Sequence, residues 1–405
     1  MTVAILRPAA RRGNLLTIVS DEGLRLFFPL AALHAALWPL LWVVAWRFSL
    51  PMIDATLPGQ WHAQEMIIGS FGAALIGFLT SALPEWTDSP RMKGWPLFLL
   101  AAVWAVGRLA GFAGAEPLIV VAAVADQAWL LFLLAYTLSA SWRRRTTAFA
   151  GFVLFLAALA VSAGALRLAM LRGDADAGEI AIRIGAFAFL GLLALALTRI
   201  TVPITNRVLD PTEATSPYRP HPGRVNLAPG LVGLLLVGEF AGLSEPVRGY
   251  LMIAAGAAFL DRVAEGFIGR EAIQAEILVL TSSCGFAGAG LLLGGLSLIG
   301  LPLSFVGAVH LMMMGGLGIG VLAVLSIAGL LHTDRPLRFA RQTKAAIGLM
   351  VAAVMLRLAP EFAPGLDLRG GPHGAAAVLW ALSFVLWLGV YVPYLWRANP
   401  NPEGN

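Results

Sequence analysis

The feature that most constrains this fold is a series of about twelve apolar segments, each close to the ~20 residues that a helix needs to cross a bilayer. Because the lipid core offers no water to unpaired backbone groups, segments of this length cross it as helices. Charged residues make up 13% of the 405 residues, whereas soluble domains carry about 25%. The sequence therefore predicts an all-α, polytopic membrane protein.

The expected spans are Leu26–Trp46, His62–Leu83, Trp95–Phe112, Pro117–Ala140, Thr146–Leu171, Ile180–Arg199, Asn226–Gly242, Val247–Gly266, Gln274–Leu296, Leu301–Leu331, Ala340–Ala359 and His373–Trp396. Charged residues such as Glu239 and Asp261 crowd the seventh and eighth spans, which makes these two the weakest of the series. The predicted organisation is a cytoplasmic segment (1–25), six spans (26–200), a linker (201–225), six further spans (226–396) and a cytoplasmic tail (397–405).

The predicted linker, Thr201–Val225, is rich in proline and polar residues, which favours a loop. No convincing sequence repeat relates the segments on its two sides, although a structural repeat stays open. The glycine-dense runs Gly285–Gly295 and Gly315–Gly320 lie inside apolar spans and follow no strand. They therefore indicate close helix packing, and a nucleotide-binding loop is disfavoured.

Basic residues set the orientation. If the N-terminus is cytoplasmic, the connections on that side and the C-terminal end carry Arg7, Arg11, Arg12, Arg25, Arg91, Lys93, Arg143, Arg144, Arg145, Arg207, Arg219, Arg224, Arg262, Arg270, Arg335, Arg338, Arg341, Lys344 and Arg397. The opposite connections carry little more than Arg47, Arg172, Arg248 and Arg369. This asymmetry predicts that both termini are cytoplasmic, and it explains the net charge of +5 without nucleic acid as a partner.

Histidines at membrane depth are candidate functional groups, because a bilayer penalises polar side chains that have no task there. His34 and His310 are each expected near the middle of a span, and His62 at the outer mouth of another. Because His34 and His310 lie at matching depth, they are expected to approach each other, with at least one of them as a ligand of haem iron. His332 is expected at the cytoplasmic edge, about 33 Å from His310 along one helix, so these two cannot share a metal ion. The chain has one cysteine, Cys284, and no Cys-x-x-Cys-His run, so any haem is non-covalent.

Two further sets of residues bear on the prediction of a metal or haem site. His62, Glu65 and Met66 are spaced to share one helical face, where imidazole and thioether suit copper or haem iron and Glu65 could orient the imidazole. A helix start with an aromatic anchor and a capping acid explains the same run equally well. Four arginines map to the outer thirds of their spans: Arg108, Arg167, Arg183 and Arg357. They could snorkel to lipid phosphates or clamp an anionic ligand such as haem propionates.

The chain resembles the NnrS family of bacterial haem- and copper-containing membrane proteins linked to nitric oxide stress. The matching motifs are Leu26–His34, Trp61–Met66, Gly77–Thr87, Trp104–Ala110, Val202–Asn206 and His310 with Leu331–Leu337. The chain also departs from the family. Gln64 stands where the family typically has a second histidine, a ninth-span histidine is replaced near Thr281–Cys284, and a tenth-span arginine is replaced near Ile327. Because a neutral amide binds transition metals poorly, haem is expected in preference to copper, and loss of both also fits.

The resemblance implies a protein that binds a b-type haem in the outer half of the bundle and acts in nitric oxide metabolism or protection from nitrosative stress. It also implies the inner membrane of a Gram-negative bacterium. The cofactor-binding candidates are His34, His62, His310, Arg108, Arg167, Arg183 and Arg357, and the metal-ligand candidates are His34, His62, Met66, His310 and His332. Two alternatives stay open: a transporter or channel for a small anion or neutral solute, and a haem-dependent sensor without turnover. The sequence also leaves open whether the protein is a nitric-oxide-related oxidoreductase, and it points to no electron donor.

Overall fold

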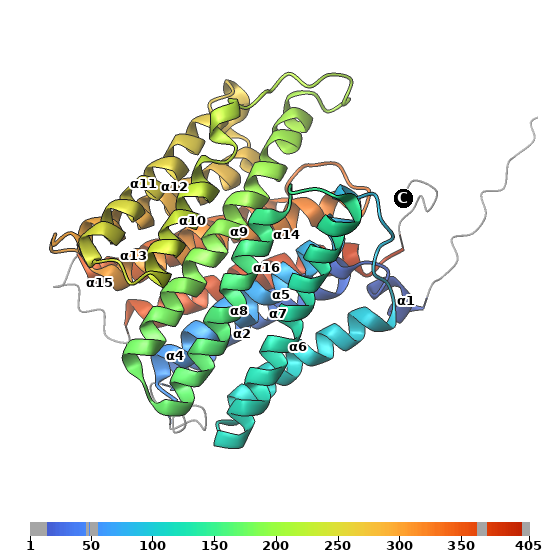
Figure 1. Ribbon diagram of the computed structural model, residues 1–405. Helices are drawn as coiled ribbons and strands as arrows, with labels where there is room; N and C mark the ends of the chain where they lie inside the picture. Colours follow the sequence, from blue (N-terminus) through green and yellow to red (C-terminus); the bar gives the residue numbers. More distant parts are fainter. Residues whose placement is uncertain (1–13, 46–47, 49–55, 363–370, 399–405) are drawn as a thin grey trace, which may run out of the picture.

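The computed structural model describes residues 14–45, 48, 56–362 and 371–398, and within these ranges it is helical with no strand (Figure 1). Five of the arginines used to assign the orientation, namely Arg7, Arg11, Arg12, Arg47 and Arg369, lie outside the described residues. Ten helices among the described residues are long and apolar enough to cross a membrane. The expectation of an all-α, polytopic membrane protein is thus confirmed.

The helices run in chain order as α1 (Leu15–Val19), α2 (Gly23–Ala45), α4 (Pro58–Gln64), η1 (Glu65–Phe71), α5 (Gly72–Trp86), α6 (Trp95–Ala113), α7 (Glu116–Arg144), α8 (Ala150–Arg172), α9 (Ala175–Leu209), η2 (Pro222–Arg224), α10 (Leu227–Phe240), α11 (Glu245–Val263), η3 (Ala264–Gly266), η4 (Arg270–Ile273), α12 (Ala275–Leu298), α13 (Phe305–His310), η5 (Leu311–Gly318), α14 (Ile319–Leu331), α15 (Arg341–Phe362) and α16 (Pro372–Leu395). The segments η1 and η5 are π-helical and join α4 to α5 and α13 to α14 without a break.

Each expected span corresponds to a helix, with two differences of length. The seventh and eighth spans are α10, which has 14 residues, and α11, which has 19 residues and contains Arg248 and Arg262. Neither is among the ten helices that fit a membrane span by length and composition. In addition, α9 continues to Leu209 through Pro203, so the first part of the expected linker is helical. A proline removes only one helical hydrogen bond, and burial of Ile204 and Thr205 holds the rest of this turn in place.

Most long helices that follow one another pack as neighbours, α5 and α6 being an exception, and the first long helix also packs against the last. Arg25 on α2 donates through Nη1 to the carbonyl oxygens of Leu395 (2.7 Å) and Arg397 (2.9 Å) at the end of α16. Trp380 on α16 donates in turn to the carbonyl of Ala35 on α2 at 3.0 Å. These bonds close the bundle between the two ends of the chain.

The structure reveals a repeat that the sequence analysis did not find. The shift in numbering that carries Glu65, the first residue of η1, onto Leu311, the first residue of η5, also aligns the spans that follow. It superposes Met66 on Met312, Gly69 on Gly315, Gly72 on Gly318, Leu79 on Leu325, Ala82 on Ala328, Thr87 on Thr333, Asp88 on Asp334 and Pro90 on Pro336. The two π-helical spans are therefore equivalent parts of an internal repeat.

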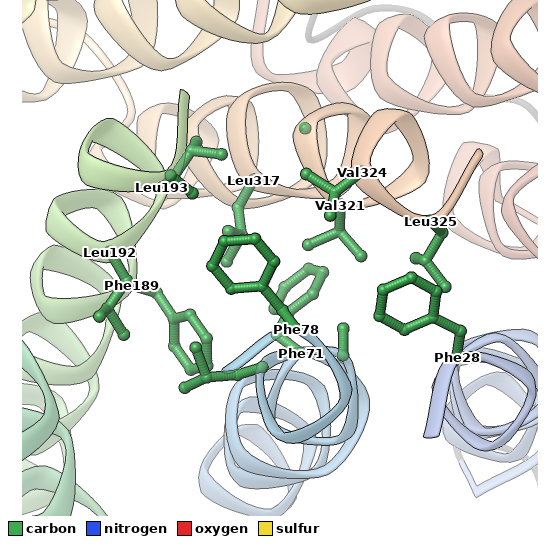
Figure 2. A pocket seen from close by; sticks show the side chains of 14 residues that line it. Phe28, Phe71, Phe78, Phe189, Leu192, Leu193, Leu317, Val321, Val324 and Leu325 are labelled. Atoms are coloured by element: carbon green, nitrogen blue, oxygen red, sulfur yellow. The ribbon is translucent and has the colours of Figure 1, made fainter. Parts of the chain in front are cut away.

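The turns that end these spans match in detail. Asp88 (φ 43°) and Asp334 (φ 52°) both adopt the left-handed conformation, which aspartate tolerates better than most residues. The preceding threonines, Thr87 and Thr333, each donate at 2.6 Å to the carbonyl four residues earlier. In each repeat the next helix, α6 or α15, carries the triplet Arg-Leu-Ala near its outer end, beginning at Arg108 or Arg357. The two repeats face each other across an apolar cavity between α5 and α14 (Figure 2).

Glycines bring α11 and α12 into backbone contact. A Cβ atom added at Gly256 would lie 2.7 Å from the carbonyl oxygen of Gly288, and one added at Gly288 would lie 2.8 Å from that of Gly256. Gly249 and Gly295 form a second pair of the same kind. Close packing thus explains part of the run Gly285–Gly295, as the sequence analysis expected.

Candidate functional site

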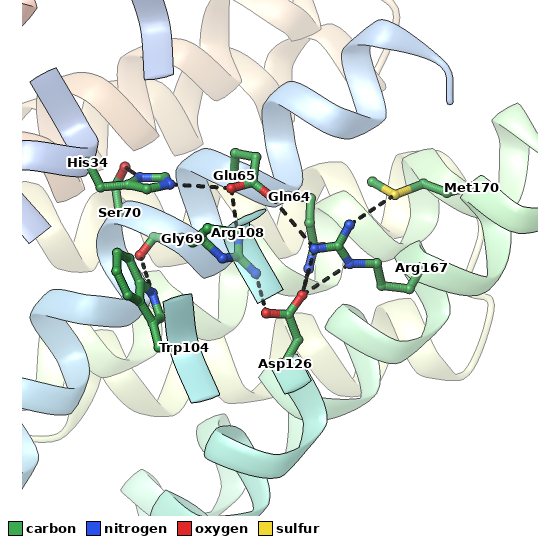
Figure 3. A network of polar contacts seen from close by, with 10 residues as sticks. All are labelled: His34, Gln64, Glu65, Gly69, Ser70, Trp104, Arg108, Asp126, Arg167 and Met170. Carbon is green, nitrogen blue, oxygen red and sulfur yellow. Dashed lines mark hydrogen bonds and ion pairs between the residues drawn. The ribbon is translucent and has the colours of Figure 1, made fainter. Parts of the chain in front are cut away.

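Five charged or polar side chains from four spans form a buried network, which we call the ion network (Gln64, Glu65, Arg108, Asp126 and Arg167; Figure 3). Asp126 on α7 accepts from Arg108 on α6, and its Oδ2 accepts from Nε (3.0 Å) and Nη2 (2.7 Å) of Arg167 on α8. Glu65, the first residue of η1, lies 3.0 Å from Arg108 Nη1 and 3.6 Å from Arg167 Nη2. Each arginine therefore contacts both carboxylates.

The ion network balances its charge within the bundle. It contains two guanidiniums and two carboxylates, and none of these side chains is more than 2% exposed. Gln64 completes it by donating its amide N–H to Asp126 Oδ2 at 2.9 Å. Taking such charges out of water costs several kcal/mol per ion, and mutual pairing offsets this cost only with good geometry. The network is therefore a specific feature of the bundle, with every formal charge partnered.

His34 adjoins the ion network with both ring nitrogens engaged. Nδ1 lies 2.7 Å from Ser70 Oγ, and Nε2 lies 3.3 Å from Glu65 Oε2. The ring is stacked on Trp38 at 3.9 Å between centroids and meets Trp104 edge-on. The chain also comes close to the ring at Gly69, where an added Cβ would lie 2.5 Å from the imidazole. A ligand can reach a nitrogen of His34 only if one of these contacts opens.

The outer arginines point into the bundle, but their partners are carboxylates of the chain itself. Arg108 and Arg167 pair within the ion network, and Arg183 pairs with Glu239 (3.4 Å), which also accepts from Arg248. Arg108 and Arg167 each already have carboxylate partners within the chain, so a haem propionate would have to compete with these carboxylates for either arginine. The sequence analysis missed Asp126. A lone aspartate inside the span Pro117–Ala140 is the signal that could have revealed it, since such a charge needs a cationic partner.

A second group, which we call the outer histidine cluster, contains His62, His310, Arg357 and Glu361. His310 ends α13, and its Nδ1 lies 2.8 Å from the carbonyl of Val306 and 3.4 Å from Arg357 Nη2. Because a carbonyl can only accept, the shorter contact assigns the proton to Nδ1 and leaves Nε2 as the ring's acceptor. His62 is within electrostatic reach of His310 and Arg357, and its ring is stacked on Trp42 at 4.9 Å. Arg357 also pairs with Glu361 at 3.1 Å.

The structure thus places His62 within electrostatic reach of His310, whereas the interactions of His34 are with Ser70 and Glu65 and do not include His310. The reason is depth: the span of His310 begins at Phe305, so this residue lies near the outer end of its helix. Trp42, which contacts His62, is about 12 Å farther along α2 than His34. The expected contact of Glu65 with His62 is also not formed, because Glu65 contacts His34 and the arginines. Met66 packs half-buried against the core.

At the edge of the bundle that is predicted to be cytoplasmic, His332 forms what we call the edge cluster with Glu22, Glu85 and Arg91. His332 Nδ1 lies 2.9 Å from Glu22 Oε1 and 3.5 Å from Glu85 Oε1, and Arg91 contacts both carboxylates. Within the described ranges, Glu22, Glu85 and His332 are the one group of three histidine, cysteine or acidic side chains whose ligand atoms lie close enough together to hold a metal ion. Because Arg91 already supplies positive charge beside the two carboxylates, the geometry favours a set of ion pairs over a metal site. These ion pairs join the ends of α2, α5 and α14.

Glu22 and His332 lie just outside the spans, before α2 and after α14, and the ionisation of one affects the other. Burial opposes the charge on His332, but the hydrogen bond and charge of Glu22 outweigh burial and raise the pKa of His332 above its ordinary value. Burial likewise opposes the charge on Glu22, yet His332 and Arg91 hold the pKa of Glu22 below its ordinary value. The ion pair therefore contributes stability fully below the unfolded histidine pKa of 6.5, and loses it as pH rises through the raised pKa.

This coupling predicts a pH-dependent effect of His332→Gln. The melting temperature of the variant should lie well below that of the wild type near pH 6, and the difference should narrow as the pH rises through the raised pKa of His332. Thermal unfolding in detergent, repeated as the pH is raised from about 6, measures this difference in melting temperature. The matched control is His221→Gln in the exposed linker, which should follow the wild type throughout. A difference in melting temperature that stays constant with pH would exclude a charged His332 in the edge cluster.

The family comparison now bears on these clusters. A sequence model of the NnrS family, described as NnrS protein, matches residues 18–399, nearly the whole chain. The chain belongs to the NnrS family. No curated protein matches it. In this NnrS-family chain the run Trp61–Met66 contributes to both groups: His62 belongs to the outer histidine cluster, whereas Gln64 and Glu65 belong to the ion network.

Proposed function

We propose that this NnrS-family protein binds a b-type haem in the outer half of the bundle and acts in nitric oxide metabolism or in protection from nitrosative stress. We further propose that it resides in the inner membrane of a bacterium. The observation that carries the proposal is the outer histidine cluster. His310 is held through Nδ1 by a backbone carbonyl, the arrangement that commonly orients a metal-ligating imidazole, and its Nε2 stays available.

The residues present fit a haem at this cluster better than elsewhere. His62 and His310 would hold the haem iron through their imidazoles, since His62 makes no hydrogen bond through its ring among the described residues. Arg357, in contact with both His310 and Glu361, is the guanidinium placed to meet a propionate. His34, Arg108 and Arg167 fit less well, because they are fully buried among Ser70 and the two carboxylates of the ion network, whereas Arg357 and Glu361 lie at the half-buried end of the bundle. When bound, haem iron would supply a centre at which a small nitrogen oxide could bind in place of one of the two imidazoles.

Copper has weaker support. Gln64 replaces a family histidine, and its amide is directed to Asp126 in the ion network. Copper content of protein purified without added metal is therefore expected to be far below one equivalent, and stoichiometric copper would contradict this. The alternative of an anion transporter that uses the outer arginines as its filter loses support. Arg108 and Arg167 are neutralised by Glu65 and Asp126, which would exclude a mobile anion from their guanidiniums.

The visible spectrum of protein purified from haem-supplied cells tests the proposal. A Soret band is expected in the wild type, and His62→Ala or His310→Ala should lower bound haem by at least about tenfold, because each removes an iron ligand. His34→Ala should keep the Soret position, since His34 is occupied by Glu65 and Ser70. A colourless wild type would refute the haem proposal. Loss of haem in His34→Ala alone would refute this choice of ligands.

A further inference from the structure

A cavity of about 50 Å³ lies between α2, α5, α9 and α14, with half-buried Phe78, Val321 and Val324 on its more open side (Figure 2). Aromatic rings from three of these elements project into it, among them Phe28, Phe78 and Phe189. Leucine, valine, alanine and glycine complete the wall, so every residue that lines the cavity is apolar. None of the residues of the ion network, the outer histidine cluster or the edge cluster belongs to this wall.

The cavity is built from equivalent positions of the internal repeat. The shift that relates η1 to η5 pairs four wall residues on one side with four on the other: Phe71 with Leu317, Ala74 with Gly320, Leu75 with Val321, and Phe78 with Val324. In secondary transporters built from internal repeats, substrates bind where the repeats meet, commonly beside interruptions of regular helix in corresponding spans. Here both spans are interrupted by a π-helix at the same register, and π-helical segments often mark functional sites.

The chemistry of the wall decides what the cavity holds. A buried water needs two to four polar partners, and apolar side chains offer none, so the cavity excludes stable water. A site for one water needs roughly 10–15 Å³ by the same measure, so about 50 Å³ admits only a molecule of a few heavy atoms. Lipid acyl chains and haem are much larger. Apolar cavities of this kind in proteins stay dry and take up xenon.

We propose that the cavity between the two repeats binds a small apolar gas of the size of a diatomic molecule or a xenon atom. The site is separate from the outer histidine cluster and needs no residue proposed to hold haem. Ala74 and Gly320 occupy equivalent positions on opposite walls of the cavity. Gly320 must stay without a side chain, because an added Cβ would lie 2.6 Å from Leu193 Cδ1 and from Ser283 Oγ.

Xenon is the probe that tests the site. Crystals of the full-length protein under xenon pressure should show one anomalous peak between Ala74 and Gly320. Ala74→Leu should abolish this peak because the larger side chain fills the space. The matched control is Ala102→Leu, on the exposed face of α6, which should keep the peak. Ala196→Leu fills the cavity from α9 and provides the same test if Ala74→Leu does not fold.

Three results would overturn the proposal: no xenon peak in the cavity of the wild type, density for an acyl chain or detergent there, or a peak that persists in the filled variants. None of them depends on haem content. Since the haem test relies on His62 and His310, failure of one proposal would leave the other standing.

Discussion

Asp126→Asn is expected to destabilise the folded protein by about 3–5 kcal/mol, the cost of removing one partner from a buried ion pair. Asp126 accepts from Arg108 and Arg167, so the variant leaves two buried guanidiniums with Glu65 as their one carboxylate. Reversible denaturation in mixed micelles measures the free energy of unfolding. Asp88→Asn is the matched control, because Asp88 is exposed and asparagine also tolerates its positive φ; its effect should be small.

A second substitution distinguishes a charge effect from a packing effect. If the loss in Asp126→Asn arises from uncompensated positive charge, Arg167→Gln in the same chain removes that excess and should recover part of the stability. Strictly additive losses would instead indicate that Asp126 contributes through shape. Equal stability of Asp126→Asn and the wild type would rule out the ion network as described.

Gly288→Ala is expected to cost about 1–3 kcal/mol or more by overpacking the contact between α11 and α12. The added Cβ would lie 2.8 Å from the carbonyl oxygen of Gly256 and 3.0 Å from the backbone nitrogen of Leu260. Backbone atoms cannot rotate away as a side chain can, so the helices must separate. The melting temperature in detergent reports the loss, and Gly256→Ala should behave alike because it presses on Gly288 from the facing helix.

Gly389→Ala on α16 is the control for this change. A Cβ at Gly389 meets nothing within 4 Å, so helix propensity alone acts, and the variant should be neutral or more stable by up to about 1 kcal/mol. If Gly288→Ala matched Gly389→Ala, α11 and α12 would not be packed backbone to backbone.

The family resemblance rested on local motifs, and its extent is confirmed over residues 18–399. The sequence identified most of the charged and histidine side chains that lie inside the spans, but it did not identify their interaction partners correctly. The outer arginines were expected to face lipid phosphates or an anionic ligand, whereas Arg108 and Arg167 pair with Asp126. Matching a charge to its partner requires knowing which faces of α6, α7 and α8 meet. Spans that are apolar around most of their circumference do not reveal those faces.

The depth of a residue in the membrane is also difficult to predict from the sequence. Counting residues from an apolar boundary placed His310 at the middle of the membrane, but the helix begins four residues later than the expected span and brings His310 close to His62. The repeat escaped notice because few of its matched positions are identical and an insertion before Arg357 shifts the register. Two π-helical segments at equivalent positions made it visible, since backbone geometry persists where side chains have diverged.

By itself, the sequence determined that this chain is helical, because apolar segments of bilayer length can satisfy their backbone only as helices within lipid. It also identified most of the residues whose polarity is out of place there. The tertiary structure alone decided that Glu65 and Asp126 neutralise Arg108 and Arg167, that His62 and not His34 accompanies His310, and where the two repeats leave a cavity. These outcomes depend on the rotation and depth at which each helix packs. Such quantities are set by side chains far apart in the sequence and therefore by no single segment.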